Sequence, residues 1–506
     1  MVLVPIAIIA VVAIFVVPAL TKGAPVLSKA GDISAFYSYG KVYVVNNDGS
    51  VNELDGVLQG QFKKSLDNTK AAFVVSDDGY SAGTLYYASG KGKPEKIADD
   101  VVNFVLADSG DGVAFYNNFD PNARLADLSL YDARNGETHK LDNNAYFTDS
   151  YDYYYVAAGF FAVISPDGKT VAYKADYSDG GYKTKINING KAEDLGVNIQ
   201  PVAVADGAKY IYHIKTRENG EALYVSKGPA AEEIRLDRVS AYNDFHLNAD
   251  YSQIVFTNYD GKSYVSANGG EKSLIAQYSV DKFLVSADIG YVRKKPEDYY
   301  NSMSISVYGL GDFRNRAFSS GGEINYIDGA FERTSVAKSV YGGAEPTITK
   351  DGKWVYYVSY GYELKKVSVT DPETAVTVAK EVYGFAVAKD GNTVYYVNYD
   401  GDLYSKKSGD DGKGTRISGD VSGYSLCVSG SGTVFFLADF WGSSGTLYTV
   451  SGTERKRVRD DVADGVVAGV SAVFYFVYED RAYDVYRSGG GADFKKVAAA
   501  DSPLVR

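Results

Sequence analysis

The hydrophobic residues of this chain fall into short blocks of strand length, and the blocks repeat at a nearly constant interval. In the last third, the block Val355-Tyr356-Tyr357-Val358 is echoed by blocks that begin at Val394, Val434 and Val473. The intervals between the four leading valines are 39, 40 and 39 residues. A fixed self-similarity of about forty residues is typical of a propeller or a solenoid.

Each repeat has the same internal order of apolar and polar segments. In one of the clearest copies, an apolar strand at 385–388 precedes the turn Asp390-Gly391, and a second apolar strand precedes the turn at 399–402. Asp-Gly pairs between such strands are strong hairpin signals. A third strand with Leu403-Tyr404 and a more polar fourth strand around 414–417 complete the copy. Four antiparallel strands of rising polarity predict one blade of an all-β fold, the β-propeller.

Weaker copies precede these four and bring the count to about eleven repeat units. Their centres lie near Val42, Ala71, Val113, Val171, Tyr210, Ile254 and Ile289. The third and the seventh of these intervals are long, so we expect an insertion in each. Eleven units exceed the four to eight blades that are usual in one ring. Two arrangements therefore stay open, one large ring and two packed rings divided near 295–345.

The N-terminal segment predicts a membrane anchor. Val2 to Leu20 contains no charged residue, and as a helix it would rise roughly 28 Å, close to the hydrocarbon thickness of a bilayer. No basic residue precedes it, and no good cleavage site follows it, so we expect residues 1–22 to be a transmembrane anchor, with a signal peptide as the alternative. We expect a linker at 23–31 and the repeat region at 32–506. The expected location is a single-pass cell-membrane protein with an extracytoplasmic soluble region.

Composition agrees with many short strands and excludes several kinds of site. The chain has 45 tyrosines and 53 glycines, which favour strands and tight turns. A net charge of -12 disfavours a nucleic-acid partner. The single cysteine, Cys427, excludes an intramolecular disulfide, and His139, His213 and His246 lack the spacing of zinc ligands. We expect no metal and no cofactor.

Two segments carry a resemblance to known families. The segment 164–173, Ile-Ser-Pro-Asp-Gly-Lys-Thr-Val-Ala-Tyr, resembles the TolB-type, WD40-like propeller repeat with its Ser-Pro-Asp-Gly-Lys turn. The stretch 395–404 is similar to the repeat of bacterial surface propellers of the DUF5050 group. The resemblance implies a propeller over most of 31–506. It says little about function, because such repeats occur in envelope scaffolds and beside peptidase domains alike.

Catalytic motifs are weak in this sequence. Gly79-Tyr80-Ser81-Ala82-Gly83 matches the nucleophile-elbow pattern, but it lies between two predicted strands, where a glycine-rich hairpin loop is expected. The Asp-Gly turns lack the alternating oxygen ligands of a calcium loop. We therefore expect no catalytic residue.

Two aromatic clusters lie outside the predicted core and are our candidate binding residues. Phe440 and Trp441 follow a second strand and are expected in a loop. The first insertion carries the other cluster, Tyr151, Tyr153, Tyr154 and Tyr155. Aromatic side chains on loops stack on sugars or anchor a peptide partner.

These features predict a non-catalytic binding or scaffold module. It would hold a protein, peptide or cell-envelope glycan partner near the membrane. The alternative is a carbohydrate-active hydrolase or lyase, because a propeller can bring carboxylates from several blades into one axial funnel. A carboxylate that meets a basic or tyrosine partner in that funnel would favour the enzyme.

Overall fold

The computed structural model describes residues 31–501 with short gaps. The residues left out within this range are 39, 80, 148–161, 179–180, 218–219, 240–243, 286–291, 295–303, 430, 469–471 and 480–481. The expected anchor at 1–22, all but the last residue of the linker, and Tyr151, Tyr153, Tyr154 and Tyr155 lie outside the described residues. No helix among the described residues is long and apolar enough to cross a bilayer.

The described chain is built almost entirely of antiparallel β-strands, as predicted. The first sheet consists of β1 (Ser34–Ser38), β2 (Lys41–Val45) and β3 (Val51–Asp55). The second sheet contains β4 (Val57–Lys64), β5 (Ala71–Ser76), β6 (Gly83–Ala88), β7 (Glu95–Leu106), β8 (Gly112–Asp120), β9 (Leu125–Asp132), β10 (Glu137–Tyr146), β11 (Ala162–Ile164), β12 (Thr170–Ser178), β13 (Gly181–Ile188) and β14 (Lys191–Val197).

The middle of the chain forms three further sheets. One contains β15 (Ile199–Val204), β16 (Ile211–Arg217), β17 (Gly220–Ser226) and β18 (Glu233–Arg238). The next contains β19 (Asp244–Leu247), β20 (Gln253–Thr257), β21 (Ser263–Ala267), β22 (Lys272–Ala276), β24 (Val292–Lys294) and β25 (Ser304–Tyr308). The third contains β23 (Val280–Phe283), β26 (Arg316–Ser320), β27 (Glu323–Ile327) and β28 (Arg333–Ala337).

Three sheets complete the chain. The first two consist of β29 (Thr347–Ile348), β30 (Trp354–Val358), β31 (Leu364–Ser368) and β32 (Val376–Ala379), and of β33 (Val382–Val387), β34 (Thr393–Asn398), β35 (Leu403–Lys407) and β36 (Thr415–Ser418). The last contains β37 (Cys427–Val428), β38 (Val434–Trp441), β39 (Ser444–Ser451), β40 (Glu454–Ala468), β41 (Val473–Glu479), β42 (Ala482–Ser488) and β43 (Lys495–Ala500). Single turns of 3₁₀-helix occur at η1 (Asp206–Ala208), η2 (Pro372–Thr374) and η3 (Gly423–Ser425).

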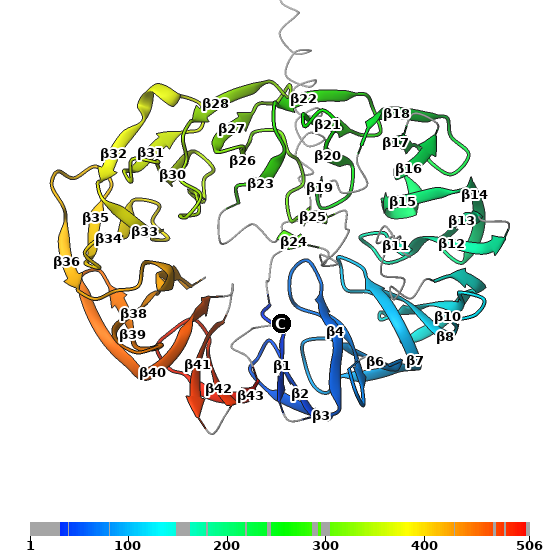
Figure 1. The fold of residues 1–506 in the computed structure, drawn as a ribbon, viewed down its shortest axis with the longest axis horizontal. Helices are drawn as coiled ribbons and strands as arrows, with labels where there is room; N and C mark the ends of the chain where they lie inside the picture. The colour runs from blue at the N-terminus through cyan, green and yellow to red at the C-terminus, as the bar shows by residue number, and fades with distance from the viewer. Residues whose placement is uncertain are drawn as a thin grey trace, which may run out of the picture.

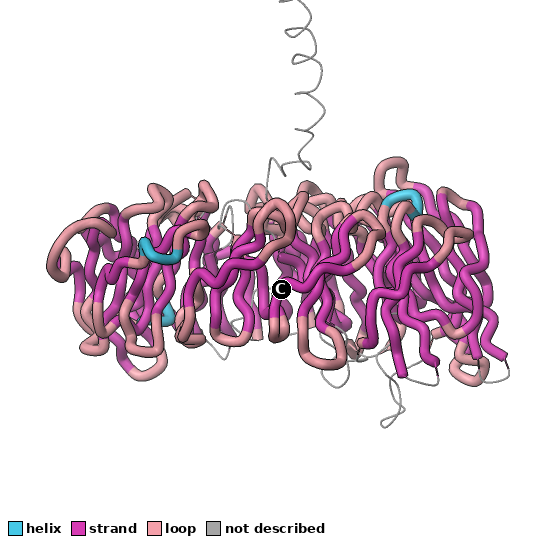
Figure 2. Tube along the Cα trace, turned by 90° about the horizontal axis from the view of Figure 1, so that it is seen from above, coloured by secondary structure: helices cyan, strands magenta, loops and turns pink. Residues whose placement is uncertain are grey.

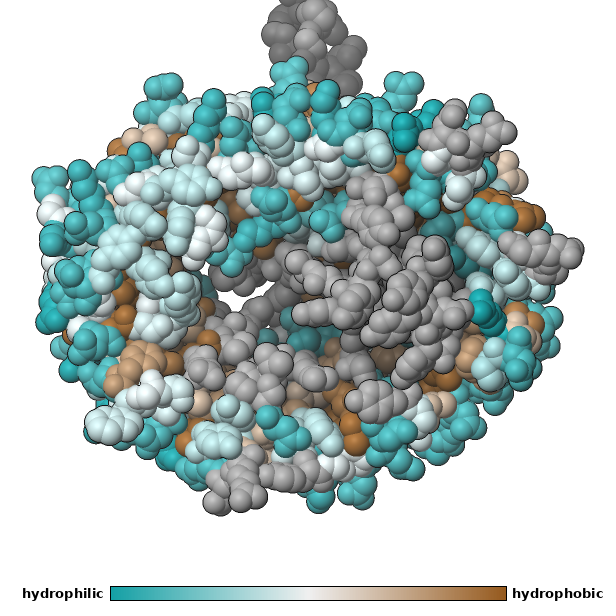
Figure 3. Space-filling model, in the orientation of Figure 1, coloured by the Kyte–Doolittle hydropathy of each residue, from teal (hydrophilic) through white to brown (hydrophobic). Residues whose placement is uncertain are grey.

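The sheets follow one another around one ring, with early strands such as β15 and β33 toward the centre and late strands such as β18 and β36 at the rim (Figure 1). This arrangement is a β-propeller. Of the two arrangements that the repeat count left open, the described strands form the single ring. An opening is visible near its centre (Figure 3).

The second insertion corrects one predicted unit. We expected a unit centred near Ile289, which lies outside the described residues. The second strand of that sheet is β26, further along the chain, because β24 and β25 are inserted before it. β25 pairs in parallel with β19 of the preceding sheet, and this pairing joins residues about sixty positions apart. No local pattern predicts such a contact.

The hydrophobic core lies between neighbouring sheets. In one of its clusters, Tyr356 and Val358 of β30 pack with Val394 and Tyr396 of β34. The second strands are therefore buried on both faces, which explains why they are continuous apolar runs, whereas the rim strand β3 alternates exposed and half-buried residues.

The ring closes through side chains. β1 and β43 belong to different sheets, but Phe36 of β1 lies 5.7 Å from Phe474 and 6.3 Å from Phe476 of β41, measured between ring centroids. The backbone N–H of Asp501 donates to the carbonyl of Tyr37 at 2.9 Å. Packing and a few hydrogen bonds thus join the first sheet to the last.

The strands run between two faces that carry loops (Figure 2). Because neighbouring strands are antiparallel, turns between second and third strands, such as 399–402, share one face with the links between sheets, such as 380–381. We call it the link face. The opposite face carries turns between first and second strands, such as 389–392, and we call it the turn face.

Candidate functional site: a tyrosine array on the link face

Exposed tyrosines gather on the link face over three neighbouring sheets. Two of them follow directly from turn chemistry: Tyr360 and Tyr399 lie in the turns after β30 and β34. At the second turn, the Asn398 side chain accepts a hydrogen bond from the N–H of Asp402 at 2.8 Å, and Gly401 has a φ of 77°. These residues close the turn tightly and leave the Tyr399 ring outside it. The array consists of Tyr341, Tyr360, Tyr362, Tyr383, Tyr399 and Tyr424.

The rings of this array touch one another in a continuous chain. The distances between successive ring centroids are 6.4, 5.1, 4.9, 6.2 and 5.0 Å in the order Tyr360, Tyr341, Tyr362, Tyr399, Tyr383, Tyr424. Four of the five contacts are edge-to-face, the geometry that the ring quadrupole favours. The six rings therefore form one contiguous aromatic surface.

The array is exposed to solvent. Tyr360 is 63% exposed, Tyr399 51% and Tyr424 75%. Side chains of intermediate hydropathy, pale in Figure 3, gather over β30 to β36 on the face shown. Soluble proteins rarely leave contiguous patches of large side chains uncovered, and such patches mark interaction sites.

Neighbouring hydroxyl groups raise the pKa of two tyrosines of the array. A hydrogen bond with the Tyr424 hydroxyl raises the pKa of Tyr383 to about 12. Partial burial and the neighbouring Tyr362 hydroxyl raise the pKa of Tyr399 above its usual value. The array combines aromatic rings with hydrogen-bonding tips, a combination typical of binding interfaces.

Phe440 and Trp441 lie on the same face, in the sheet that begins just after Tyr424. They are 43% and 90% exposed, as expected for candidate contacts. The structure corrects their predicted place in a loop: both belong to β38, and Trp441 pairs with Ser444 of β39. The strand extends to the tip because the tight turn at Gly442 keeps the hairpin paired. Whether they bind a partner stays a prediction.

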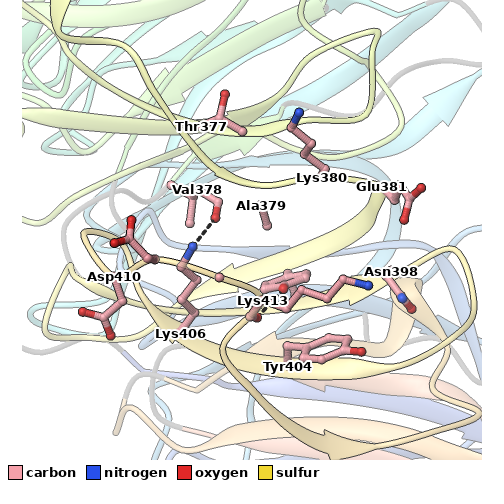
Figure 4. A pocket seen from close by; sticks show the side chains of 13 residues that line it. Thr377, Val378, Ala379, Lys380, Glu381, Asn398, Tyr404, Lys406, Asp410 and Lys413 are labelled. Carbon is pink, nitrogen blue, oxygen red and sulfur yellow. Dashed lines mark hydrogen bonds between the residues drawn. The ribbon is translucent and has the colours of Figure 1, made fainter.

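A pocket of about 390 Å³ lies at the rim, between the sheet of β29–β32 and the sheet of β33–β36 (Figure 4). The buried Lys406 ammonium crosses it and donates to the Val378 carbonyl at 2.7 Å. Tyr396 and Tyr404 stack on its floor with ring centroids 5.3 Å apart. Lys413 and Asp410 are at its mouth. Its lining residues include no nucleophile beside a base, so the pocket could bind a ligand by packing and charge but contains no catalytic pair.

One pair of aspartates is the best candidate for the enzymatic alternative. Burial and the neighbouring Asp167 raise the pKa of Asp206 to about 6. Both residues shape turns of the turn face: Asp206 Oδ1 accepts from the N–H of Asp167 at 2.9 Å, and Asp167 Oδ1 accepts from Ser165 Oγ at 2.6 Å. The pair therefore joins two neighbouring turns, and a structural role accounts for its geometry.

The remaining reactive side chains are occupied by packing. Ser81 of the Gly-x-Ser-x-Gly sequence donates to Asp78 at 2.8 Å in the turn after β5, which confirms the hairpin loop. His246 uses both ring nitrogens, near Tyr308 Oη at 3.1 Å and the Val280 carbonyl at 3.0 Å.

His213 and Cys427 fit the same description. Burial lowers the pKa of His213, whose Nε2 lies 3.1 Å from Glu233 Oε1. Burial raises the pKa of the Cys427 thiol to about 12, so the thiol is unreactive at neutral pH. Within the described residues, no three His, Cys, Asp or Glu side chains are placed to hold a metal ion.

The sequence pointed to Trp441 but missed the tyrosine array. One signal was present: the tetrapeptide Asn-Tyr-Asp-Gly occurs twice, at 258–261 and 398–401. Each copy places a tyrosine at the tip of a second-to-third-strand turn. Only the ring shows that the tyrosines of neighbouring units meet.

The solved structures that resemble this chain do so at low sequence identity and low TM-score. Neither a protein-family model nor a curated protein matches the chain. The crystal structure of the tricorn protease is similar at 12% identity over 94% of this chain and 62% of that chain, with a TM-score of 0.28. A eukaryotic initiation factor has 10% identity over 77% and 95%, with a TM-score of 0.41. TolB from Acinetobacter baumannii has 13% identity over 60% and 78%, with a TM-score of 0.30.

The chain thus spans 62% of the length of the tricorn protease chain. Membership of the TolB-type or DUF5050 families stays a prediction. The propeller fold itself is assigned from the strand order and the ring described above.

Proposed function

We propose that this protein is a non-catalytic binding module whose partner docks on the tyrosine array of the link face. One observation carries the proposal: six tyrosines from three sheets form one mutually contacting surface, in which three rings are exposed and three are half-buried. Tyrosine provides a large contact area at low cost in conformational entropy, and it is enriched among residues that dominate binding energy. The partner is a protein, a peptide or a cell-envelope glycan.

The proposal includes a location outside the cytoplasm, at the cell membrane. Its support is the uncharged segment from Val2 to Leu20. Fractionation of cells should find the full-length chain in membranes, and deletion of residues 1–23 should release it in soluble form. Recovery of the unmodified chain in the cytosol would refute the location and leave the docking surface untouched.

We also infer that the ring contains eleven units, the first of them three-stranded. The support is that two long strands each pair with the strands of two neighbouring units. β7 pairs with β6 through its first half and with β8 through its second, and β40 is divided in the same way between β39 and β41. A three-dimensional reconstruction of the purified protein should resolve eleven spokes, and any other number would contradict the count.

The docking surface can be tested with a matched pair of variants. In the full-length protein, Tyr360, Tyr399 and Tyr424 are replaced together by alanine, and Tyr478→Ala serves as control. Tyr478 is 57% exposed at the tip of another hairpin, outside the array. Crosslinking in membranes should give partner adducts with the wild type and the control and lose them with the triple variant. Equal adducts from all three proteins would refute the proposal.

A further inference from the structure

The two copies of the Asn-Tyr-Asp-Gly turn differ in what covers the tyrosine. In both turns, the tyrosine N–H donates to the carbonyl of a link residue: Tyr259 to Arg238 at 3.0 Å, and Tyr399 to Glu381 at 3.1 Å. Arg238 and Glu381 therefore hold their turns through the same backbone hydrogen bond, and of the two only Glu381 has a positive φ, 58°. The Arg238 guanidinium lies over the Tyr259 ring, 4.5 Å from its centroid. At the array, the residue that accepts this bond carries a carboxylate, and the Tyr399 ring has no such cover.

Stacking of cations on tyrosines is common elsewhere in this molecule. Lys174 lies 4.3 Å from the Tyr182 centroid, and Lys272 lies 4.3 Å from that of Tyr264. In the described part of the chain, no Lys or Arg is placed over any of the six array rings. A tyrosine face with a neighbouring carboxylate attracts an ammonium or a guanidinium.

Unpaired carboxylates surround the Tyr399 turn. Glu381 is hydrogen-bonded to it through the backbone, Asp400 belongs to it, and Asp420 lies beside Gly401 of the same turn. All three are exposed, and none forms an ion pair with a described residue. Asp400 accepts a hydrogen bond from the Asn398 side chain at 3.4 Å, and Arg416 is near Asp420. Three exposed carboxylates without a salt bridge, next to aromatic faces that no cation covers, are complementary to a positively charged ligand.

We propose that the array binds a basic, extended polypeptide segment of a partner protein, with arginine side chains stacked on the tyrosine rings and paired with Glu381, Asp400 and Asp420. The inference rests on the proposed function and names the chemistry of the partner. Arginine suits this surface better than lysine, because its planar guanidinium stacks on a ring and bonds a carboxylate in the same pose. The net charge of -12 attracts such a segment at long range.

The test measures binding of a fluorescein-labelled peptide of alternating Arg and Ser to the full-length protein in detergent, by fluorescence anisotropy. A peptide of alternating Glu and Ser and a neutral chitooligosaccharide are compared in the same assay. The Arg peptide should bind, more weakly as salt is raised, and the other two should not. Glu381→Gln combined with Asp400→Asn and Asp420→Asn should weaken binding about tenfold and flatten the salt dependence. Asp493→Asn, an exposed acid at a turn-face hairpin, should change neither.

A self-blocking variant gives the sharpest comparison. Glu381→Arg replaces a carboxylate of the array by a guanidinium beside the Tyr399 turn, so it should abolish binding of the Arg peptide while the melting temperature stays unchanged. Arg238→Glu is the reciprocal change, because it uncovers Tyr259 beside Asp260. It should add a second site, weaker than the array because a single ring replaces six, which the stoichiometry of the titration would reveal.

Several results would overturn the inference. They are equal binding of the Arg and Glu peptides, unchanged Arg-peptide binding by the acid or self-blocking variants, array-dependent binding of the chitooligosaccharide alone, or self-association that the array variants abolish. If membrane crosslinks depend on the array but the Arg peptide does not bind, this inference fails while the proposed function stands. If neither depends on the array, both fail.

Discussion

The contact that closes the ring can be weakened at one side chain. Phe36 is 1% exposed and lies between the first and the last sheet, where it touches Phe474 and Phe476. We consider the substitution Phe36→Ala. Elsewhere in the ring, consecutive sheets are also joined by the chain itself, but here the side chains and a few hydrogen bonds act alone. The substitution therefore removes a large part of what holds the two ends together.

The expected loss follows from burial and ring contacts. Truncation of a buried phenylalanine to alanine costs about 3–5 kcal/mol. Each of the two aromatic contacts adds ~0.5–1.5 kcal/mol beyond burial, and part of this is already contained in that range. We expect a loss of about 4 kcal/mol in the free energy of unfolding. In a double-mutant cycle, Phe36→Ala and Phe474→Ala should show a coupling of about 1 kcal/mol, since the rings touch.

Urea denaturation measures the free energy, and hydrogen exchange shows where the structure loosens. Phe73→Ala is the matched control. Phe73 is equally buried, contacts two rings of its own sheet, and packs in the core between the first and second sheets, which the chain connects. Exchange in Phe36→Ala should rise first in β1, β2, β41 and β42. A loss below about 1 kcal/mol, or an exchange pattern identical to that of the control, would refute closure by these side chains.

Other parts of the ring give three further expectations. Trp441→Ala should change the free energy of unfolding in urea by less than about 0.5 kcal/mol, because the side chain is 90% exposed; a loss of several kcal/mol would show that it is packed. The pKa of Asp206 is raised from 3.8 to about 6, so the folded chain holds a proton that the unfolded chain has lost, and stability should fall as pH rises through this window. Asp206→Asn should remove that slope in thermal melts, by less than about 1 kcal/mol since the carboxyl is partly exposed. Gly384→Ala should cost ~1–3 kcal/mol in urea, because a Cβ there would lie 2.4 Å from the Gly423 carbonyl oxygen, whereas Gly409→Ala, with open space around it, should be nearly neutral.

The strand order could be predicted because its signals are local. The blocks at Val355, Val394, Val434 and Val473 are the second strands β30, β34, β38 and β41. Alternating polarity and Asp-Gly turns depend on neighbours a few residues away, so they are readable in the chain. The prediction failed near Ile289, where the inserted β24 and β25 interrupt the repeat and β25 pairs in parallel with a distant strand.

The sequence by itself determined the class of fold, because repeat period, strand polarity and turn chemistry are properties of short segments. Only the tertiary structure decided the single ring and the tyrosine array. Tyr360, Tyr399 and Tyr424 lie in three different units, and their rings join one surface only because the closed ring sets these units side by side with their links on the same face. The Arg238 guanidinium lies over the Tyr259 ring, whereas the Tyr399 turn is hydrogen-bonded to Glu381. This difference also depends on which residue of a neighbouring link each turn contacts.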